Sequence, residues 1–248
     1  MKKLLIALLL APLAGMLIAG AALASEEGYP LDHAPIDPSD LVSLQAGART
    51  FVNYCLSCHS AHFMRYNRLE DLRLTPQEIE DNLMFASDKI GSTMKVAMSP
   101  EDGKKWFAVA PPDLSVIARA RGADWLYTYL RTFYRDPKSA TGWNNAVFPH
   151  VGMPHVLWAL QGERALETKT VTQEGESKVE YQWTQLTPGA LTGPQYDATV
   201  RDLVNYLVYM SEPAGLVRRR IGVVVLFVLG ILFVLTYLLK REYWKDVK

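Results

Sequence analysis

The chain has 248 residues, of which 26 are basic and 26 acidic, so its formal net charge at neutral pH is zero. This length and composition allow one soluble domain of under about 200 residues together with membrane segments. The two cysteines exclude a metal site built from two cysteine pairs, and no nucleic-acid partner is expected.

The N-terminus has the pattern of a secretory signal. Lys2 and Lys3 precede an apolar run over residues 4–23, and Ala22-Leu-Ala24 is similar to a signal-peptidase site. We therefore predict a signal peptide over residues 1–24. The apolar run is somewhat long for a signal, so an uncleaved membrane anchor stays open as an alternative. In both cases the domain that follows is exported.

The next predicted element is a helix that ends in a haem-attachment motif. Apolar residues recur with helical spacing from an N-cap at Ser39 or Asp40 as far as Cys55. The sequence then reads Cys55-Leu-Ser-Cys58-His59, which is the spacing that attaches a c-type haem. On one helical turn the two cysteines share a face and can both reach the vinyl groups at one edge of a porphyrin. His59 can then bind the iron.

Two other sites are compatible with a Cys-x-x-Cys pair. A redox dithiol usually follows a strand, whereas the residues before Cys55 are predicted to be helical. A zinc site needs about four protein ligands, and the chain has no second cysteine pair. A single covalently attached haem c is therefore the predicted cofactor. His62 follows His59 too closely to reach the other face of a haem, and we expect it to be solvated.

Several elements are predicted between the haem motif and residue 135. Thr75-Pro-Gln-Glu78 has the pattern of a capping box, and consecutive prolines fix φ in the segment after Ala110. The predicted elements are a capped helix beginning at Pro76, a short helix beginning at Pro100, an extended segment over residues 110–115, helical spacing over residues 113–121 that stops at Gly122, and a helix over residues 125–134.

The remaining chain contains a hairpin, a helix and a membrane span. Alternating residues predict a β-hairpin within residues 166–186, and helical spacing returns over residues 197–210. Residues 221–239 carry no charge. A helix of that length is about 28 Å long, which is enough to cross the hydrocarbon core of a membrane.

The predicted domain organisation places this span near the C-terminus. Residues 25–216 form the exported haem domain, residues 217–239 the transmembrane anchor and residues 240–248 a cytoplasmic tail. Basic residues flank both ends of the span, so the positive-inside rule does not decide its orientation. The signal and the haem decide it, because haem attachment occurs outside the cytoplasm.

One histidine leaves the second axial position on the iron to be filled. Met94 and Met98 lie in a polar stretch, where a methionine is ordinarily a packing or surface residue. Met153 lies between a glycine that permits close approach and a proline that stiffens the loop, so Met153 is favoured, with His150 and His155 left open. Methionine opposite histidine raises the reduction potential and closes the site to small ligands.

Charge is unevenly distributed along the chain. Outside the signal, the arginines at 218–220 and the tail, the exported domain has 24 acidic and 17 basic residues, a net charge of about −7. The acidic residues occur in two groups, namely Glu70, Asp71, Glu78, Glu80 and Asp81, and then Glu163, Glu167, Glu174, Glu176 and Glu180. They form either a solvated surface or a face that steers a basic soluble partner.

The order and spacing of these motifs resemble the cytochrome c1 family of proteobacterial type. The resemblance is carried by the helix into Cys55-Leu-Ser-Cys58-His59, by Ala110-Pro-Pro-Asp-Leu-Ser115 with Arg119-Ala-Arg121, by the loop from Phe148 to Pro154, and by the single C-terminal span. It covers nearly all of the mature chain.

This resemblance implies a fold and a set of site residues. The fold would be mainly α, a cytochrome c-like haem domain with loop and β-hairpin insertions plus one C-terminal transmembrane helix. Cys55 and Cys58 would hold the haem, His59 and Met153 would ligate the iron, Arg121 would pair with a haem propionate, and Pro112 would pack on the proximal side. Some bacterial members have a further disulfide that this chain cannot form, so we expect its distal loop to be held by packing alone.

The resemblance also implies partners and a location. The chain would be a subunit of ubiquinol–cytochrome c reductase in the bacterial inner membrane, with its haem domain in the periplasm and no catalytic site of its own. Electrons would pass from the Rieske iron–sulfur protein to a soluble cytochrome c, beside cytochrome b, in a homodimer of the whole complex. The alternatives are an anchored cytochrome serving another oxidase or dehydrogenase, and a haem sensor, which the nine-residue tail argues against.

Overall fold

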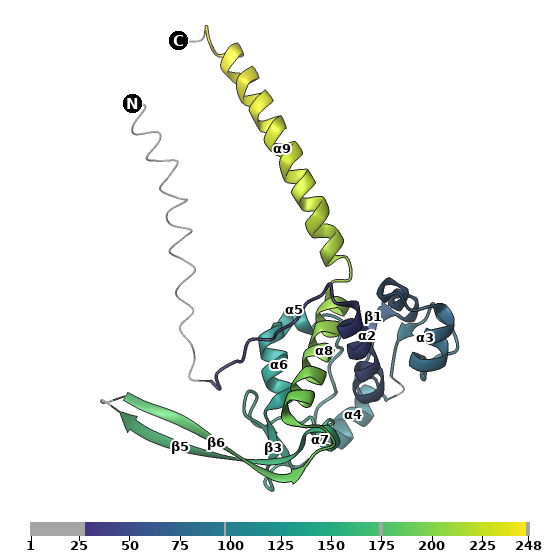
Figure 1. Cartoon of the computed structure of the whole chain (residues 1–248), viewed down its shortest axis with the longest axis vertical. Helices are drawn as coiled ribbons and strands as arrows, with labels where there is room; N and C mark the ends of the chain where they lie inside the picture. The colour runs from purple at the N-terminus through teal and green to yellow at the C-terminus, as the bar shows by residue number, and fades with distance from the viewer. Residues whose placement is uncertain (1–27, 97, 174–175, 247–248) are drawn as a thin grey trace. The chain divides into compact units, whose positions relative to one another are not determined.

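The computed structural model describes residues 28–96, 98–173 and 176–246. The predicted signal peptide, residues 1–24, lies outside the described residues, as does the tip of the predicted hairpin at 174–175. Within the described part the chain is mainly helical, with three two-stranded antiparallel sheets (Figure 1). The fold is therefore the predicted one, a largely α-helical domain with hairpin insertions and one long C-terminal helix.

The described helices and strands are as follows in chain order: α2 (Leu41–Thr50), η2 (Phe51–Cys55), β1 (Ala61–Arg65), η3 (Tyr66–Leu72), α3 (Pro76–Leu83), β2 (Thr93–Met94), α4 (Pro100–Phe107), α5 (Ile117–Arg121), α6 (Ala123–Arg131), β3 (Phe133–Arg135), β4 (Trp143–Asn145), α7 (Trp158–Gln161), β5 (Gly162–Gln173), β6 (Glu176–Pro188), α8 (Gly193–Ser211) and α9 (Gly215–Tyr243).

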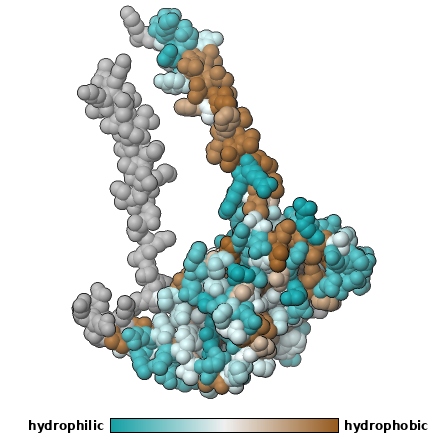
Figure 2. All heavy atoms as spheres, viewed as in Figure 1, coloured by the Kyte–Doolittle hydropathy of each residue, from teal (hydrophilic) through white to brown (hydrophobic). Residues whose placement is uncertain are grey.

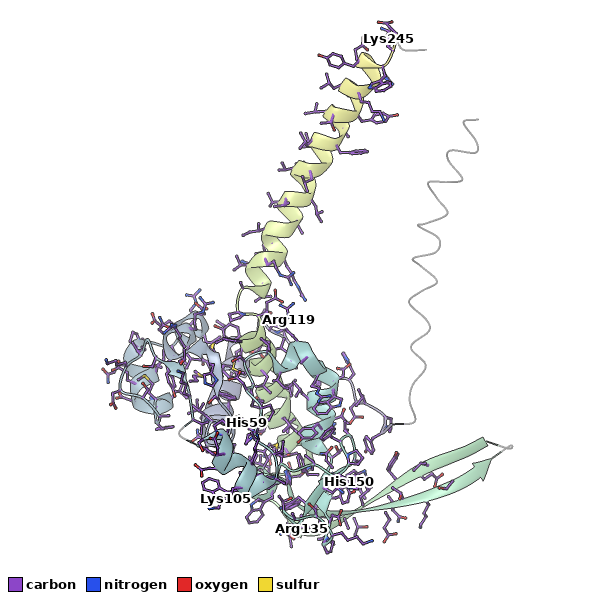
Figure 3. All side chains as sticks on the ribbon, turned by 180° about the vertical axis from the view of Figure 1, so that it is seen from behind. His59, Lys105, Arg119, Arg135, His150 and Lys245 are labelled. Atoms are coloured by element: carbon purple, nitrogen blue, oxygen red, sulfur yellow. The ribbon has the colours of Figure 1, made fainter. Side chains whose placement is uncertain are left out.

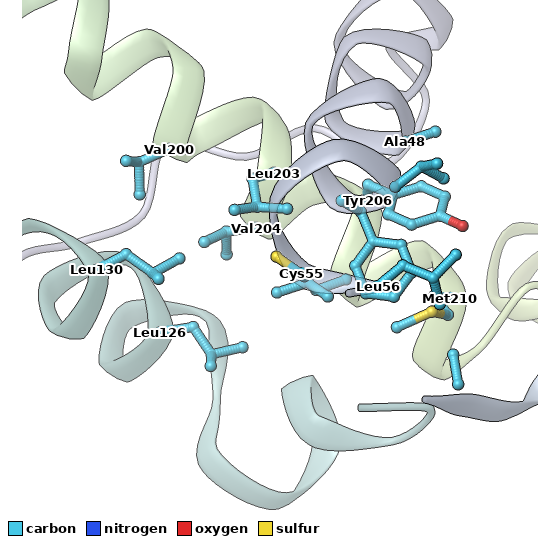
Figure 4. Packing of buried hydrophobic residues seen from close by; sticks show 14 of the residues in the cluster. Ala48, Cys55, Leu56, Leu126, Leu130, Val200, Leu203, Val204, Tyr206 and Met210 are labelled. Carbon is cyan, nitrogen blue, oxygen red and sulfur yellow. The ribbon is translucent and has the colours of Figure 1, made fainter. Parts of the chain in front are cut away.

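The packing of α2 against α8 forms the centre of the core. Gly47 lies so close to the carbonyl of Asp202 and to Tyr206 that a Cβ at this position would overlap both. The rings of Phe51 and Tyr206 are tilted against each other at 5.5 Å between centroids. Figure 4 shows Cys55 beside Leu203 of α8, with α6 facing them. The close helix crossing thus places the haem motif next to the core.

The helix that delivers the haem motif begins and ends as predicted. Asp40 is the N-cap, and its side chain accepts hydrogen bonds from the N–H groups of Val42 and Ser43. The last turn is a π-helix, in which the N–H of Leu56 donates to the carbonyl of Phe51. A π-turn adds one residue to a helical turn and often occurs at functional sites. Here it ends at Cys55, the first cysteine of the motif.

The two capped helices α3 and α4 also confirm the prediction. Thr75 and Glu78 form the reciprocal capping box at the start of α3. The side chain of Ser99 accepts a hydrogen bond from the N–H of Asp102 at the start of α4. Both helices have proline in their first turn, where a missing N–H costs nothing.

The two helices after the double proline are shorter than predicted. The first, α5, begins only at Ile117, because residues 112–115 are bound in extended form along the Ser60–Phe63 segment. Gly122 ends it as predicted, with a φ of +88°. The second, α6, ends at Arg131, because the residues from Phe133 on pair with β4. Tertiary pairing therefore overrides helical spacing at both places.

The predicted β-hairpin is present and extends further than expected. Strands β5 and β6 pair in an antiparallel register that places Leu166 opposite Trp183 and Thr168 opposite Tyr181. The hairpin joins the rest of the domain at its base, where the rings of Tyr134 and Trp183 meet at 6.3 Å. The helix that follows, α8, begins four residues before the prediction, at a capping box formed by Thr192 and Gln195.

The C-terminal helix α9 is long and apolar enough to cross a membrane. Its 29 residues correspond to about 43 Å, which exceeds the hydrocarbon thickness of about 30 Å. None of them is buried. Apolar residues cover the middle of this helix continuously in Figure 2. The predicted span, residues 217–239, lies entirely inside it.

Candidate haem site

A cavity of about 390 Å³ lies at the C-terminal end of η2. Its walls come from α5, α6 and α8, from the segment after α4 and from the loop after β4. Most of the lining side chains are apolar, including Leu126, Leu130, Leu203 and Leu207. An apolar, partly open cavity of this kind suits a flat apolar cofactor with a polar edge.

The haem motif forms one wall of this cavity. The N–H groups of Cys58 and His59 both donate to the carbonyl of Cys55, at 3.1 and 2.9 Å, so the motif forms a helical turn. Both cysteines line the cavity. Burial, with a smaller contribution from the neighbouring thiol, raises the pKa of Cys55 to about 12. A redox dithiol requires a lowered thiol pKa, so this environment disfavours that alternative.

His59 is held as a neutral imidazole. Its Nδ1 lies 2.7 Å from the carbonyl oxygen of Pro112, which can only accept, so Nδ1 carries the proton and donates. Burial lowers the pKa of His59, although the hydrogen bond to Pro112 and the charge of Asp113 oppose this shift. The ring therefore keeps a lone pair on Nε2, the form in which histidine binds a metal. Figure 3 shows His59 in the interior of the domain, with Lys105 at its edge.

The segment that carries the Pro112 carbonyl is tied to β1 by several hydrogen bonds. The carboxylate of Asp113 accepts from the N–H and the Nδ1 of His62, at 2.9 and 2.6 Å. The Ser115 hydroxyl accepts from the N–H of Phe63, and the N–H of Leu114 donates to the carbonyl of Ser60. His62 is half exposed, as predicted, and it helps to fix the acceptor of the His59 hydrogen bond.

Among the five candidates for the second axial position, the structure places Met153 in the cavity wall. Met94 is fully buried in β2, where the hydroxyl of Tyr206 lies 3.8 Å from its sulfur. His150 is exposed, and the imidazole of buried His155 is bonded to Gln161 and stacked on Phe133. Neither of these histidines nor Met98 lines the cavity.

The sulfur of Met153 has a hydrogen-bond donor that the sequence analysis did not identify. The hydroxyl of Tyr129 lies 3.3 Å from this sulfur, and the Tyr129 ring also lines the cavity. Just before Met153, Gly152 lies against Val109 and the carbonyl of Phe107, where a Cβ would be too close to both. The structure thus requires a glycine here for packing against the segment after α4, whereas the predicted close approach to a haem ring stays a prediction.

The distal loop is held by hydrogen bonds as well as by packing, which corrects the expectation of packing alone. The side-chain oxygen of Asn145 accepts from the N–H groups of Val147 and Phe148, at 2.9 and 3.1 Å. The side-chain oxygen of Asn144 accepts from the N–H of His150 at 2.8 Å. Asparagine is typical of such turns because its amide can bond backbone groups two or three residues on. That preference is the only sequence signal for these residues.

Arg121 lies at the exposed rim of the cavity. Its guanidinium is 5.1 Å from the ring centroid of Trp125 and 5.8 Å from that of Phe148. Within the described residues it forms no salt bridge. A cation held by aromatic rings at the mouth of an apolar cavity can receive an anionic group of a bound cofactor. Pro112 also lines the cavity and is itself exposed.

These residues fit a covalently attached haem. Two thiols, one neutral imidazole and one thioether line the same apolar cavity, and the guanidinium of Arg121 lies at its rim. Within the described residues no group of three or more histidine, cysteine or acidic side chains could hold a metal ion by themselves. The donor set is thus the one expected for a porphyrin iron.

Known proteins are similar to this chain over all or nearly all of its length. A sequence model of the Cytochrome C1 family matches residues 32–247. A Nitrosomonas europaea protein named ammonia monooxygenase gamma subunit is 49% identical, covering 99% of this chain and 98% of that protein. Cytochrome c1 of Allochromatium vinosum is 46% identical over the whole of both chains, and that of Rhodospirillum rubrum is 27% identical over 95% of this chain and 96% of its own.

The family match spans the haem motif, the cavity and the C-terminal helix together. Members of this family carry a covalently bound haem c and act in electron transfer in the respiratory chain. The chain belongs to the Cytochrome C1 family.

Proposed function

We propose that this protein relays electrons from a Rieske iron–sulfur protein to a soluble cytochrome c, as a subunit of ubiquinol–cytochrome c reductase. The observation that supports this most directly is the placement of Cys55, Cys58, His59 and Met153 around one apolar cavity. When bound there, a haem supplies one-electron oxidation and reduction of its iron.

Each site residue has a separate role in this proposal. The thiols of Cys55 and Cys58 would hold the haem covalently, and His59 Nε2 and the Met153 sulfur would ligate its iron. Arg121 pairs with a propionate, and Pro112 accepts the His59 proton in a hydrogen bond while its ring covers the proximal side. Two protein ligands exclude small molecules from the iron and leave electron transfer as the supported activity.

The proposed topology follows from the signal and from α9. The signal over residues 1–24 exports the haem domain, residues 25–216, to the periplasm. Residues 217–239 cross the inner membrane, and residues 240–248 lie in the cytoplasm. The apolar, unburied character of α9 supports the span, and the need for haem attachment outside the cytoplasm supports the orientation.

Purification of the full chain in a mild detergent tests the proposed assembly. We expect cytochrome b with its b-type haem, an iron–sulfur subunit and two copies of the complex to accompany the covalently haem-stained chain. Recovery of the haem protein without these partners would contradict the proposal. Recovery with monooxygenase subunits would favour the assembly that the name of the Nitrosomonas europaea relative suggests.

The acceptor is proposed to be a basic cytochrome c because the exported domain is acidic. Glu70, Asp71, Glu78, Glu80 and Asp81 of η3 and α3, and Glu163, Glu167 and Glu180 of the hairpin, lie outside the cavity wall, so in this proposal they act by long-range steering. Stopped-flow transfer to the acceptor should slow as ionic strength rises. A rate that stays constant across ionic strength would leave these residues as a solvated surface.

A further inference from the structure

The loop that presents Met153 depends on a single fully buried amide. Asn145 is the last residue of β4, and its exposed fraction is 0%. Its side-chain oxygen accepts from the N–H groups of Val147 and Phe148, and its nitrogen donates to the carbonyl of Tyr129 at 2.7 Å. One side chain thus joins the start of the distal loop to the end of α6.

Asn145 joins α6 to the distal loop, and these same two segments also contact each other at the Met153 thioether. Tyr129 supplies the hydroxyl that lies 3.3 Å from the Met153 sulfur, and the loop supplies the sulfur. A shift of the loop relative to α6 would therefore change both the position of the sulfur and its hydrogen bond. The bond between iron and a thioether is weak, so it depends on the protein for its position.

The loop also contains one residue, His150, with an unfavourable backbone conformation. His150 has a φ of +61°, in the left-handed region that residues other than glycine seldom adopt. The neighbouring Asn144 accepts the N–H of His150 at 2.8 Å and donates to Asp136 at 2.9 Å. Such a conformation persists when surrounding contacts determine it. The two asparagines provide those contacts from one short strand.

We propose that Asn145 is a positioning residue for the axial ligand, and that its amide keeps the Met153 thioether in place beside Tyr129. This inference rests on the proposed assignment of Met153 as the iron ligand. Removing the amide leaves buried backbone groups without hydrogen-bond partners. The equilibrium between the observed loop conformation and a displaced one then shifts by about tenfold or more towards the displaced one. The iron would then become open to a sixth ligand from solution.

The test compares two variants of the full, haem-loaded chain in detergent, Asn145→Asp and Asn145→Ser. Aspartate keeps the acceptor oxygens and loses the donor to Tyr129. Serine is the milder second variant, because a hydroxyl can still accept from the N–H two residues on. The readouts are the long-wavelength absorption of a methionine–iron(III) bond and carbon monoxide binding by the reduced protein. We expect both variants to lose much of that absorption and to bind carbon monoxide about tenfold more readily.

Asn205→Asp is the matched control. Asn205 is equally buried, and its amide donates to the carbonyl of Asp37 and to the hydroxyl of Ser43, away from the loop. The Asn205→Asp variant should be less stable than the wild type, and its methionine–iron absorption and its carbon monoxide binding should be unchanged. If the Asn145 variants behave like this control, the inference is overturned. If the wild-type protein lacks the methionine absorption, the ligand assignment itself fails, and the inference fails with it.

Discussion

At the scale of single residues, the proposed iron ligands form hydrogen bonds with other groups of the cavity wall. The carbonyl of Pro112 accepts a hydrogen bond from Nδ1 of His59, and the hydroxyl of Tyr129 lies 3.3 Å from the sulfur of Met153. Hydrogen bonds of this kind change how much electron density each ligand gives to the metal. The reduction potential should therefore respond to changes that leave both proposed ligands intact.

Replacing Tyr129 with phenylalanine should lower the midpoint potential of the haem. The variant removes only the hydroxyl, so the sulfur gives more density to the iron and stabilises the oxidised form. A potentiometric titration followed by visible absorption measures the shift. Tyr196→Phe is the control, because that buried hydroxyl donates to the carbonyl of Leu130, away from the sulfur. An unchanged or raised potential in the Tyr129 variant would contradict this prediction.

Asp113 should make the stability of the proximal segment depend on pH. Partial burial raises the pKa of Asp113, but hydrogen bonds from Ser115 and His62 outweigh burial and hold the pKa below its ordinary value of 3.8. A carboxylate with a lowered folded-state pKa stabilises the fold above the unfolded-state pKa, and this stabilisation is lost as pH falls through the folded-state value.

Denaturant titrations of the wild type and of Asp113→Asn at several pH values test the direction of this pH dependence. At neutral pH the variant should be less stable by about 1 kcal/mol, because the contact is partly exposed. The difference should shrink once the pH falls below about 3.8. A difference that stays constant down to that range would show that the charge of Asp113 contributes nothing.

At the scale of elements, the crossing of α2 and α8 places the haem motif. The two helices approach so closely at Gly47 that their backbones are nearly in contact. Because η2 continues α2 without a break, any separation of α2 from α8 would also move Cys55 away from the cavity wall. Helix packing and haem attachment are thus coupled through one glycine.

Gly47→Ala should destabilise the protein by about 2 kcal/mol or more, because the new methyl group overlaps the carbonyl of Asp202. Gly193→Ala is the matched control, since a Cβ there meets nothing within 4 Å. Denaturant unfolding followed by tryptophan fluorescence measures both. Equal stability of the two variants would mean that the helices can separate at no cost.

At the scale of the whole molecule, the haem domain and α9 suit different environments, which are water for the domain and a membrane for the helix. No residue of α9 is buried against the domain, and the contact across the junction is the ion pair between Glu212 and Arg218 at 2.6 Å. Glu212 also lies 3.7 Å from Arg119 of α5. The core of the domain does not include side chains from the anchor.

Ending the chain after Pro213 should therefore release a soluble haem protein. All the cavity-lining residues precede this point, so the absorption spectrum and the midpoint potential should match those of the full chain. Cell fractionation with haem staining locates the product. A truncated chain that fails to acquire haem would show that α9 does more than anchor the domain, and one that stays with the membrane would favour an uncleaved anchor at the N-terminus.

The sequence by itself determined the features that depend on neighbouring residues. The Cys-x-x-Cys-His motif, the capping box at Thr75, the alternation of β5 and β6 and the uncharged run of α9 are all local patterns, and the structure has each of them. The family resemblance rested on the haem motif, the segments at 110–121 and 148–154 and the C-terminal span, and it is confirmed. Local spacing alone failed where α5 and α6 were predicted too long.

Only the tertiary structure decided which candidates meet at the cavity. Five residues could fill the second axial position by type, and Met153 alone among them lines the cavity wall. Tyr129 has no sequence signal of function, and the turn preference of asparagine accounts only for the local hydrogen bonds of Asn145. Tyr129 contacts Met153, 24 residues away, and Asn145 donates to the carbonyl of Tyr129, 16 residues away, and both contacts form only when the loop folds onto α6. Packing between distant segments, which no local pattern encodes, made that choice.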